Sequence, residues 1–316
     1  MSYAQYGTIA ASDYNNLIGA AAGSTANVLN TVWATGSAGA GYGQTALANI
    51  ATGDTVTAST WANLINKTAN SASHQSSSIT SVTAPSAGNT ITYNANVVTN
   101  LQTIYTNRLN AVSQSGTSAN TATFASTWLN AVTFTHTVTF ANGDATRYFF
   151  NSGGQLAITC SHPSGTGINL LLNGLASNVG TVVLSAPTSG TATVAGTSYN
   201  GVTKIGGGGS TPVISTNSGY YAWTTANANV FYQTASTGPA GYLSTNINIF
   251  VKTNGTVGSN GDKGNIITIY TVWDEIPNGL TVSTGSATTV TVRPPETTYI
   301  ANTWGSIAIA GTSSGT

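Results

Sequence analysis

The hydrophobic period of this chain changes near residue 132, and this change limits what the chain can fold into. From Val132 to Phe140, four apolar residues and His136 alternate one by one with threonines. Strict alternation is typical of a β-strand with one buried face, because successive side chains point to opposite sides of the strand. We therefore expect an antiparallel β-sandwich over residues 131–295 and a different architecture before it.

Short apolar segments at regular spacing predict the other strands. Asn142-Gly143-Asp144 supplies turn residues, so we expect a hairpin in which Tyr148-Phe149-Phe150 returns along the first strand. Alternation resumes from Leu156 to Cys160. Glycine-rich loops are expected at 206–209 and 255–264. The remaining expected strands are 168–172, 181–184, 191–199, 247–251, 266–273 and 288–293.

The first third of the chain contains a repeated segment. Residues 8–18 are echoed by residues 55–65, and in each copy an aromatic residue and a Leu-Ile pair share one helical face. Ser12 and Ser59 are the expected N-caps of two short helices. A further helix is expected after Asn94 and a last helical turn at 125–128. Residues 1–130 are therefore predicted to form a helical docking or oligomerisation region.

The C-terminal segment has a different composition. Pro294-Pro295 ends the last expected strand, and residues 296–316 are rich in Gly, Ser and Thr. We expect a C-terminal arm there, able to reach a partner. The predicted fold class is α+β, with a short-helix N-terminal region followed by an antiparallel β-sandwich.

Charge is almost absent. Only 4% of the residues are Asp, Glu, Lys or Arg, whereas about 25% is usual in soluble domains. The seven cations are scattered, so the chain lacks the basic cluster that nucleic-acid binding requires. With seven acidic residues as well, the net charge is zero, and no long-range repulsion keeps copies apart. Self-association into a homo-oligomer is therefore expected.

The sequence also predicts where the chain is made. No apolar run approaches the ~18 residues of a membrane span, so membrane insertion is not expected. Residues 1–6 lack the basic stretch that begins a secretory signal. We expect synthesis in a cytoplasm, without export by a signal peptide.

Catalytic chemistry has few candidates. Hydrolysis of a glycan needs two carboxylates that face one bond, but Asp274 and Glu275 are adjacent in an extended segment and point to opposite sides. Cys160 and the three histidines lack the spacing of a zinc site, and the residues next to them form no nucleophile motif. His136 shares a strand face with apolar residues, which favours a core position. Neither catalytic residue, cofactor nor metal is predicted.

Two features stay open as binding sites. The turn with Asn260 and Asp262 offers one carboxylate to a calcium ion, which is too little to predict a site. Aromatic residues are concentrated in a neutral polar segment, where they fit either a partner or glycan contact surface or the core of the sandwich. These candidate contact residues are Tyr220, Tyr221, Trp223, Tyr232 and Tyr242.

Several motifs resemble recurring modules of virion proteins. The helix segment at 55–65, the preceding Gly41-Tyr42-Gly43-Gln44 and the following His74-Gln75 are similar to an N-terminal module of structural proteins of tailed bacteriophages, especially of the cyanophage and marine-phage type. The segment Arg147-Tyr148-Phe149-Phe150-Asn151-Ser152-Gly153-Gly154 resembles a recurring β-module of such proteins. The resemblance carries over an architecture and a virion location, but no catalytic or ligand-binding residue.

This resemblance implies a structural virion protein that assembles a tail fibre or a baseplate-proximal appendage and contacts the host surface. The expected partners are other copies of the chain, in a trimer by analogy with fibres, other virion proteins and a host surface glycan. A capsid decoration or neck protein is an alternative. A carbohydrate-binding adhesin module and a depolymerising spike are two more.

Overall fold

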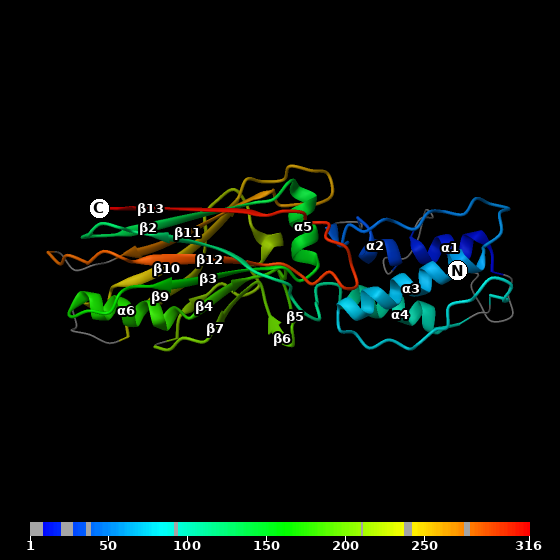
Figure 1. The fold of residues 1–316 in the computed structure, drawn as a ribbon, viewed down its shortest axis with the longest axis horizontal. Helices are drawn as coiled ribbons and strands as arrows, with labels where there is room; N and C mark the ends of the chain where they lie inside the picture. Colours follow the sequence, from blue (N-terminus) through cyan, green and yellow to red (C-terminus); the bar gives the residue numbers. More distant parts are fainter. Residues whose placement is uncertain are drawn as a thin grey trace.

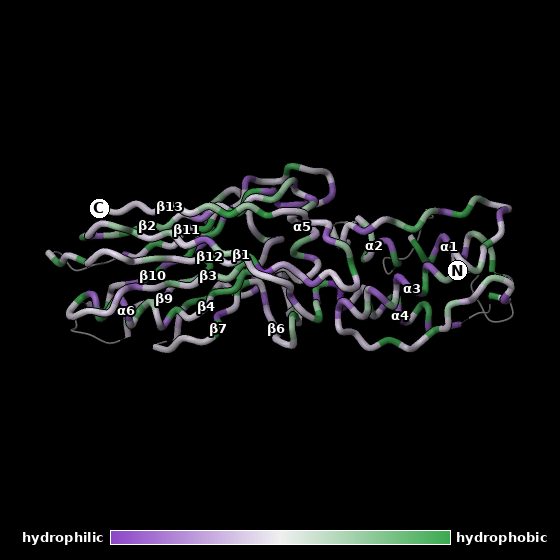
Figure 2. Tube along the Cα trace, viewed as in Figure 1, coloured by the Kyte–Doolittle hydropathy of each residue, from purple (hydrophilic) through white to green (hydrophobic). Residues whose placement is uncertain are grey.

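The computed structural model describes residues 9–19, 28–35, 39–91, 94–209, 211–236, 242–274 and 279–316. The molecule is elongated, with a helical part at one end and a β-sandwich at the other (Figure 1). Apolar stretches, shown in green in Figure 2, run through both parts, and the buried side chains form one large continuous core. The α+β fold class expected from the sequence is confirmed.

The helical part is built around the repeated segment. Its two copies form α1 (Ala11–Ile18) and α3 (Ala58–His74), as expected. Tyr14 and Trp61, which occupy equivalent places in the two copies, are both buried, and their ring centroids are 6.4 Å apart. The repeat therefore packs against itself. The other helices of this part are α2 (Leu29–Trp33) and α4 (Asn96–Thr106).

The helix starts differ from the prediction by two residues. The N-cap of α3 is Thr57, whose hydroxyl accepts the N–H of Thr60, and Ser59 lies inside the first turn. In α1, Asp13 bonds back to the N–H of Ala10, so Ser12 is not the cap either. Hydroxyl and carboxylate groups near a helix start compete for the same orphan N–H groups, and local backbone angles decide which one wins.

Two antiparallel sheets form the sandwich within the described residues. The five-stranded sheet has the order β1-β12-β3-β4-β7, and the six-stranded sheet has the order β13-β2-β11-β10-β9-β8. The strands are β1 (Ser118–Thr123), β2 (Val132–Thr139), β3 (Gln155–Ser161), β4 (Thr181–Leu184), β7 (Val202–Ile205), β8 (Val213–Ile214), β9 (Ala228–Thr234), β10 (Asn246–Thr253), β11 (Ile266–Asp274), β12 (Ala287–Arg293) and β13 (Ala308–Gly315). A separate hairpin consists of β5 (Ala192–Val194) and β6 (Thr197–Tyr199).

Strand β2 has the alternation that the sequence predicts. Its apolar residues and His136 are buried on the inner face, whereas its threonines are half-buried on the outer face. It pairs with β11 on one side and β13 on the other. Gly311 of β13 lies opposite His136, and a Cβ at Gly311 would come within 2.9 Å of the imidazole ring. His136 is thus a core residue.

The predicted hairpin at 142–150 is wrong. Asn142 does not turn the chain into a strand but caps α5 (Gly143–Asn151), its side-chain oxygen accepting the N–H of Ala145 at 2.8 Å. Asparagine followed by glycine suits both a hairpin turn and a helix start. The helix prevails because it buries Phe149 and Phe150 together at the end of the sandwich.

The predicted strand at 168–172 is also wrong. This segment begins α6 (Ile168–Val179), which packs against β3, β9 and β10. The buried residues Ile168, Leu172, Leu175 and Val179 recur at helical spacing, but the run is so apolar that its period is hidden.

Three segments outside the expected sandwich belong to it. Instead of a helical turn at 125–128, Trp128 is buried and exchanges two backbone hydrogen bonds with Val282. The expected C-terminal arm contributes β13, an edge strand of the six-stranded sheet. β1 also precedes the boundary expected at residue 130.

Candidate functional site

Of the five candidate contact residues, two lie in the core. Tyr220 and Trp223 are fully buried and surround Phe150 of α5. The Tyr220 ring stacks on that of Phe150 with centroids 4.6 Å apart, and Trp223 meets it edge to face at 5.7 Å. The Trp223 indole N–H donates to the Ser218 carbonyl at 2.7 Å. The Tyr220 and Trp223 rings therefore belong to the core, which was one of the two interpretations that the sequence left open.

The other three are half-buried and lie in different places. Tyr221 lies where the two parts meet, and its hydroxyl is 2.6 Å from Oδ1 of Asn151. Tyr232 is on the outer face of β9, opposite Asn248 of β10. Tyr242 precedes β10, and its carbonyl accepts the N–H of Thr245. The structure brings together only Tyr220, Tyr221 and Trp223.

The motifs that resemble virion modules meet at the junction of the two parts. Tyr42 is buried there, its hydroxyl accepting a hydrogen bond from Gln75 and donating to the Arg108 carbonyl, both at 2.8 Å. Burial raises the pKa of Tyr42. The His74 ring lies edge-on to the Tyr42 ring at 5.2 Å, and its Nε2 is 3.1 Å from the carbonyl oxygen of Ser152. This nitrogen therefore carries the proton, because a carbonyl only accepts.

Helix α5 attaches the sandwich to the loop after α2. The guanidinium of Arg147, fully buried, pairs with Asp144 at 3.1 Å and donates to the Thr35 carbonyl at 2.7 Å. It also lies over the Tyr148 ring, 4.6 Å from the centroid. Asn151 donates to the Gly41 carbonyl at 2.9 Å. One buried cation thus joins segments more than a hundred residues apart.

Two glycines allow this close contact. A Cβ on Gly41 would be 1.8 Å from the Ala34 carbonyl oxygen, and one on Gly43 would be 2.5 Å from the Tyr148 ring. Gly43 also has a φ of +76°, which disfavours other residues. The Gly-Tyr-Gly motif therefore serves to fit the loop tightly under α5, and the junction is a packed, hydrogen-bonded contact.

The buried histidines make the fold sensitive to acid. Burial lowers the pKa of His74 to about 4, and it also lowers the pKa values of His136 and His162. Below pH 6.5 the unfolded chain binds protons that the folded chain does not, so stability is full above pH 6.5 and falls as the pH decreases toward 4. We expect His74 alone to remove about 2 kcal/mol between pH 7 and pH 5.

Urea unfolding at the two pH values measures this loss. His74→Gln keeps a side-chain N–H for the Ser152 carbonyl but does not titrate, so its stability should change less between these pH values. An equal pH dependence in the variant would contradict the assignment.

A serine, a histidine and an asparagine are linked by hydrogen bonds at the sandwich end away from the junction. Ser286 Oγ lies 2.9 Å from Nδ1 of His162, and Nε2 of His162 lies 3.1 Å from Oδ1 of Asn169. This order resembles a nucleophilic triad. However, Ser286 is fully buried and accepts the indole N–H of Trp128, and Asn169 also accepts from Ser283. These side chains therefore form hydrogen bonds with one another and with neighbouring residues inside the protein.

We expect Ser286→Ala to destabilise the fold by about 1–3 kcal/mol, because it leaves buried groups of Trp128 and His162 without a partner. Thermal unfolding measures the effect, with Ser314→Ala on the exposed side of β13 as the control. A hydrolytic activity toward simple esters that disappears in Ser286→Ala would contradict a purely structural role.

Asp144 and Asp262 serve local structure. Asp262, buried, accepts the backbone N–H groups of Val257, Gly258 and Gly264, and Asn260 donates instead to Asp144. Asn260 and Asp262 therefore face different neighbours. Glu275 lies outside the described residues. Among the described residues, no three His, Cys, Asp or Glu side chains are placed to hold a metal ion.

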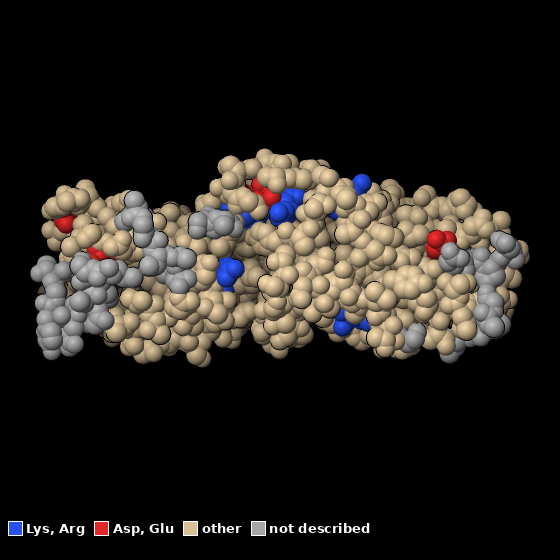
Figure 3. Space-filling model, turned by 180° about the vertical axis from the view of Figure 1, so that it is seen from behind, with Lys and Arg blue, Asp and Glu red and all other residues tan. Residues whose placement is uncertain are grey.

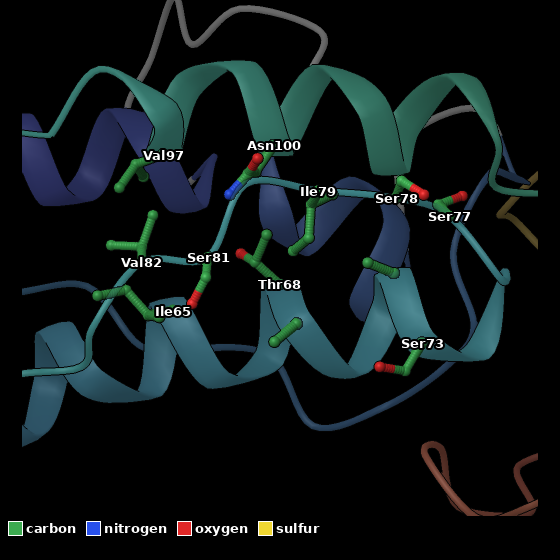
Figure 4. A pocket seen from close by; sticks show the side chains of 12 residues that line it. Ile65, Thr68, Ser73, Ser77, Ser78, Ile79, Ser81, Val82, Val97 and Asn100 are labelled. Carbon is green, nitrogen blue, oxygen red and sulfur yellow. The ribbon is translucent and has the colours of Figure 1, made fainter.

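The helical part carries a neutral hollow of about 400 Å³ (Figure 4). Ile65 and Thr68 of α3 and Val97 and Asn100 of α4 line it, together with the extended segment 77–82. Asn100 holds this segment in place by bonding to both the N–H and the carbonyl of Thr80. Hydroxyl and aliphatic groups without charge form its wall.

Most of the cations lie against aromatic rings. In the described chain, four of the seven are placed over a ring at 4.5–5.3 Å from the centroid: Lys67 over Trp33, Arg108 over Tyr105, Arg147 over Tyr148 and Lys252 over Tyr270. Figure 3 shows isolated charged groups on a broad neutral surface. The molecule therefore offers other molecules mainly hydroxyl, amide and apolar groups.

Comparison with models of protein families, with curated proteins and with solved structures finds no match to this chain. Over the residues that the model describes, none of the helices combines the length and apolar character needed to cross a bilayer.

Proposed function

We propose that this protein is a non-enzymatic structural subunit of a tailed-phage particle, located in a tail fibre or a baseplate-proximal appendage. The junction carries the proposal, because the motifs that resemble virion modules meet there and lock two unlike parts into one elongated body. The helical part docks on the particle and the sandwich is directed outward. The chain is made in the host cytoplasm and becomes part of the virion.

Neutral surfaces support a role in assembly. β13 is an eight-residue edge strand of small uncharged residues without proline. Edge strands that lack charge and proline pair readily with further strands. Together with zero net charge, this supports packing against copies of itself, with a trimer as the expected form, and against other virion proteins.

A carbohydrate-binding module is a second candidate. Tyr232, Phe250 and Tyr270 lie half-buried on the outer face of neighbouring strands β9, β10 and β11. The amides of Asn229 and Asn248, linked at 3.0 Å, accompany them. Aromatic rings beside amides suit neutral sugars, which offer both apolar faces and hydroxyls. In the assembled particle this face would contact a host surface glycan.

Localisation on the particle tests the proposal. Gold-labelled antibodies raised against the purified protein should mark the tail or its appendages in electron micrographs. Label spread over the head would favour the capsid-decoration or neck alternative, and protein absent from purified particles would overturn the proposal. Binding to a glycan array by the isolated chain, lost in Tyr270→Ala, would favour the adhesin module if the particles carry no label.

A further inference from the structure

A second pocket lies at the junction, beside the hydrogen bonds that lock it. It has a volume of about 220 Å³ and is formed by segments from both parts of the molecule. The helical part contributes the segment after α4 and the loop after α2, and the sandwich contributes the end of α5, the loop after β4 and Tyr221. The residues used below are Arg108, Asn151, Pro187, Thr188, Ser189 and Tyr221.

Arg108 is the one charged residue of this pocket lining. Its guanidinium stacks over the Tyr105 ring at 4.8 Å and gives one hydrogen bond, from Nη1 to the Tyr105 carbonyl at 3.0 Å. A guanidinium has five N–H donors in a planar fork. Within the described chain, the remaining donors of Arg108 have no protein acceptor, and no carboxylate pairs with it. Its donors are therefore available to a ligand.

The neighbouring Arg147 has no such donors available to a ligand. Arg147 is neutralised by Asp144 and is fully buried. The positive charge of Arg108 nevertheless acts on Tyr221, which forms part of the pocket wall. Burial raises the pKa of Tyr221 to about 12, while Arg147 and Arg108 act in the opposite direction. The pocket lining thus carries one positive charge, that of Arg108, and no negative charge.

Hydroxyl groups stand at the mouth of the pocket. Thr188 and Ser189 are exposed, and their hydroxyls make no hydrogen bond to the described residues. Pro187, which precedes them, is buried, and its carbonyl accepts the N–H of Gly219, so the start of this loop is fixed. Tyr221 and Asn151 bond to each other and form a firm wall.

We propose that this pocket binds a small oxyanion through the Arg108 guanidinium, with the Thr188 and Ser189 hydroxyls as further ligands. The planar fork fits a carboxylate, sulfate or phosphate in a bidentate manner. A volume of about 220 Å³ is smaller than the roughly 300–1,000 Å³ of pockets for drug-sized ligands. It suits the carboxylate of a single acidic sugar or a free inorganic anion. This site does not depend on the proposed function.

Isothermal titration of the purified full chain tests the site with four probes: glucuronate, acetate, sulfate and glucose. Glucuronate should bind, and glucose should bind at least tenfold more weakly. If glucuronate binds more tightly than acetate and sulfate, the ligand is an acidic sugar. If sulfate binds equally well or better, the ligand is an inorganic oxyanion.

Three variants make the test specific. Arg108→Gln should weaken binding at least tenfold, and Thr188→Val with Ser189→Ala, at exposed positions, should weaken it severalfold without affecting the fold. Arg293→Gln, a half-exposed arginine outside the pocket, should bind like the parent protein. Equal binding by Arg108→Gln with an unchanged unfolding temperature, or no binding of any anion by the parent chain, would overturn the proposal.

Discussion

Replacing Arg147 by methionine is expected to destabilise the protein by about 3 kcal/mol, because it removes a fully buried cation together with the hydrogen bonds and the ion pair that it makes. The Thr35 carbonyl loses its hydrogen bond, and Asp144 loses its ion pair. The side chain of Asp144 is 32% exposed, so water can solvate it, and the loss lies at the lower end of the usual range for a buried pair. Methionine retains most of the packing volume, which isolates the polar contribution.

Chemical unfolding followed by circular dichroism measures this change. Arg293→Met is the matched control, because Arg293 is half-exposed on β12 and makes no ion pair with the described residues. We expect that control to change stability by less than about 0.5 kcal/mol. Similar effects of the two substitutions would show that Arg147 is not a structural centre of the junction.

Replacing Phe150 by alanine is expected to destabilise the sandwich by about 4 kcal/mol. Phe150 is fully buried and contacts the rings of Phe149, Tyr220 and Trp223, with centroids 4.6–5.7 Å away. Truncation removes these contacts and leaves a cavity that the stacked Tyr220 ring cannot fill, because its hydroxyl is held by the N–H of Lys263.

The unfolding temperature, followed by tryptophan fluorescence, measures the loss. Leu170→Ala on α6 is the control, since Leu170 is 56% exposed, and it should change stability by less than about 0.5 kcal/mol. Phe150→Leu should recover part of the loss. A Phe150→Ala protein as stable as the control would contradict the core packing at this end of the sandwich.

The strands were predictable where one face alone is buried. β2, β10 and β11 alternate between apolar and polar residues, so the period of two is visible in the sequence. β13 was not predictable, because its Ala, Gly, Thr and Ser residues have little strand preference and are mostly exposed. The pairing with β2 stabilises β13 as a strand, although its side chains do not favour one.

Helices α5 and α6 were missed for a different reason. α5 is buried over most of its length, whereas α6 carries apolar residues such as Leu170 on its exposed side as well. Neither helix therefore shows the apolar and polar faces that make a helical period visible. The Phe149-Phe150 pair and the run from Leu170 to Leu172 fit a strand equally well from local sequence alone. Contacts with the sheets, which the local sequence does not show, determine that both segments form helices and not strands.

The candidate sites were only partly predictable. The motifs around Tyr42, His74 and Arg147 were visible as patterns, but not their contact with one another. The proposed oxyanion pocket combines residues near 40, 108, 151, 188 and 221, and among its lining residues only Tyr221 was a candidate contact residue in the sequence. Nothing in the sequence distinguished Arg108 from the other six cations.

The placement of cations over aromatic rings has a consequence for the environment in which the protein works. Forces between exposed charges are screened within about 8 Å at physiological ionic strength, but a surface of amides, hydroxyls and apolar groups has little charge to screen. Contacts that this surface makes should therefore keep their strength from dilute fresh water to sea water. Salt would affect mainly the weak association of anions with Arg108.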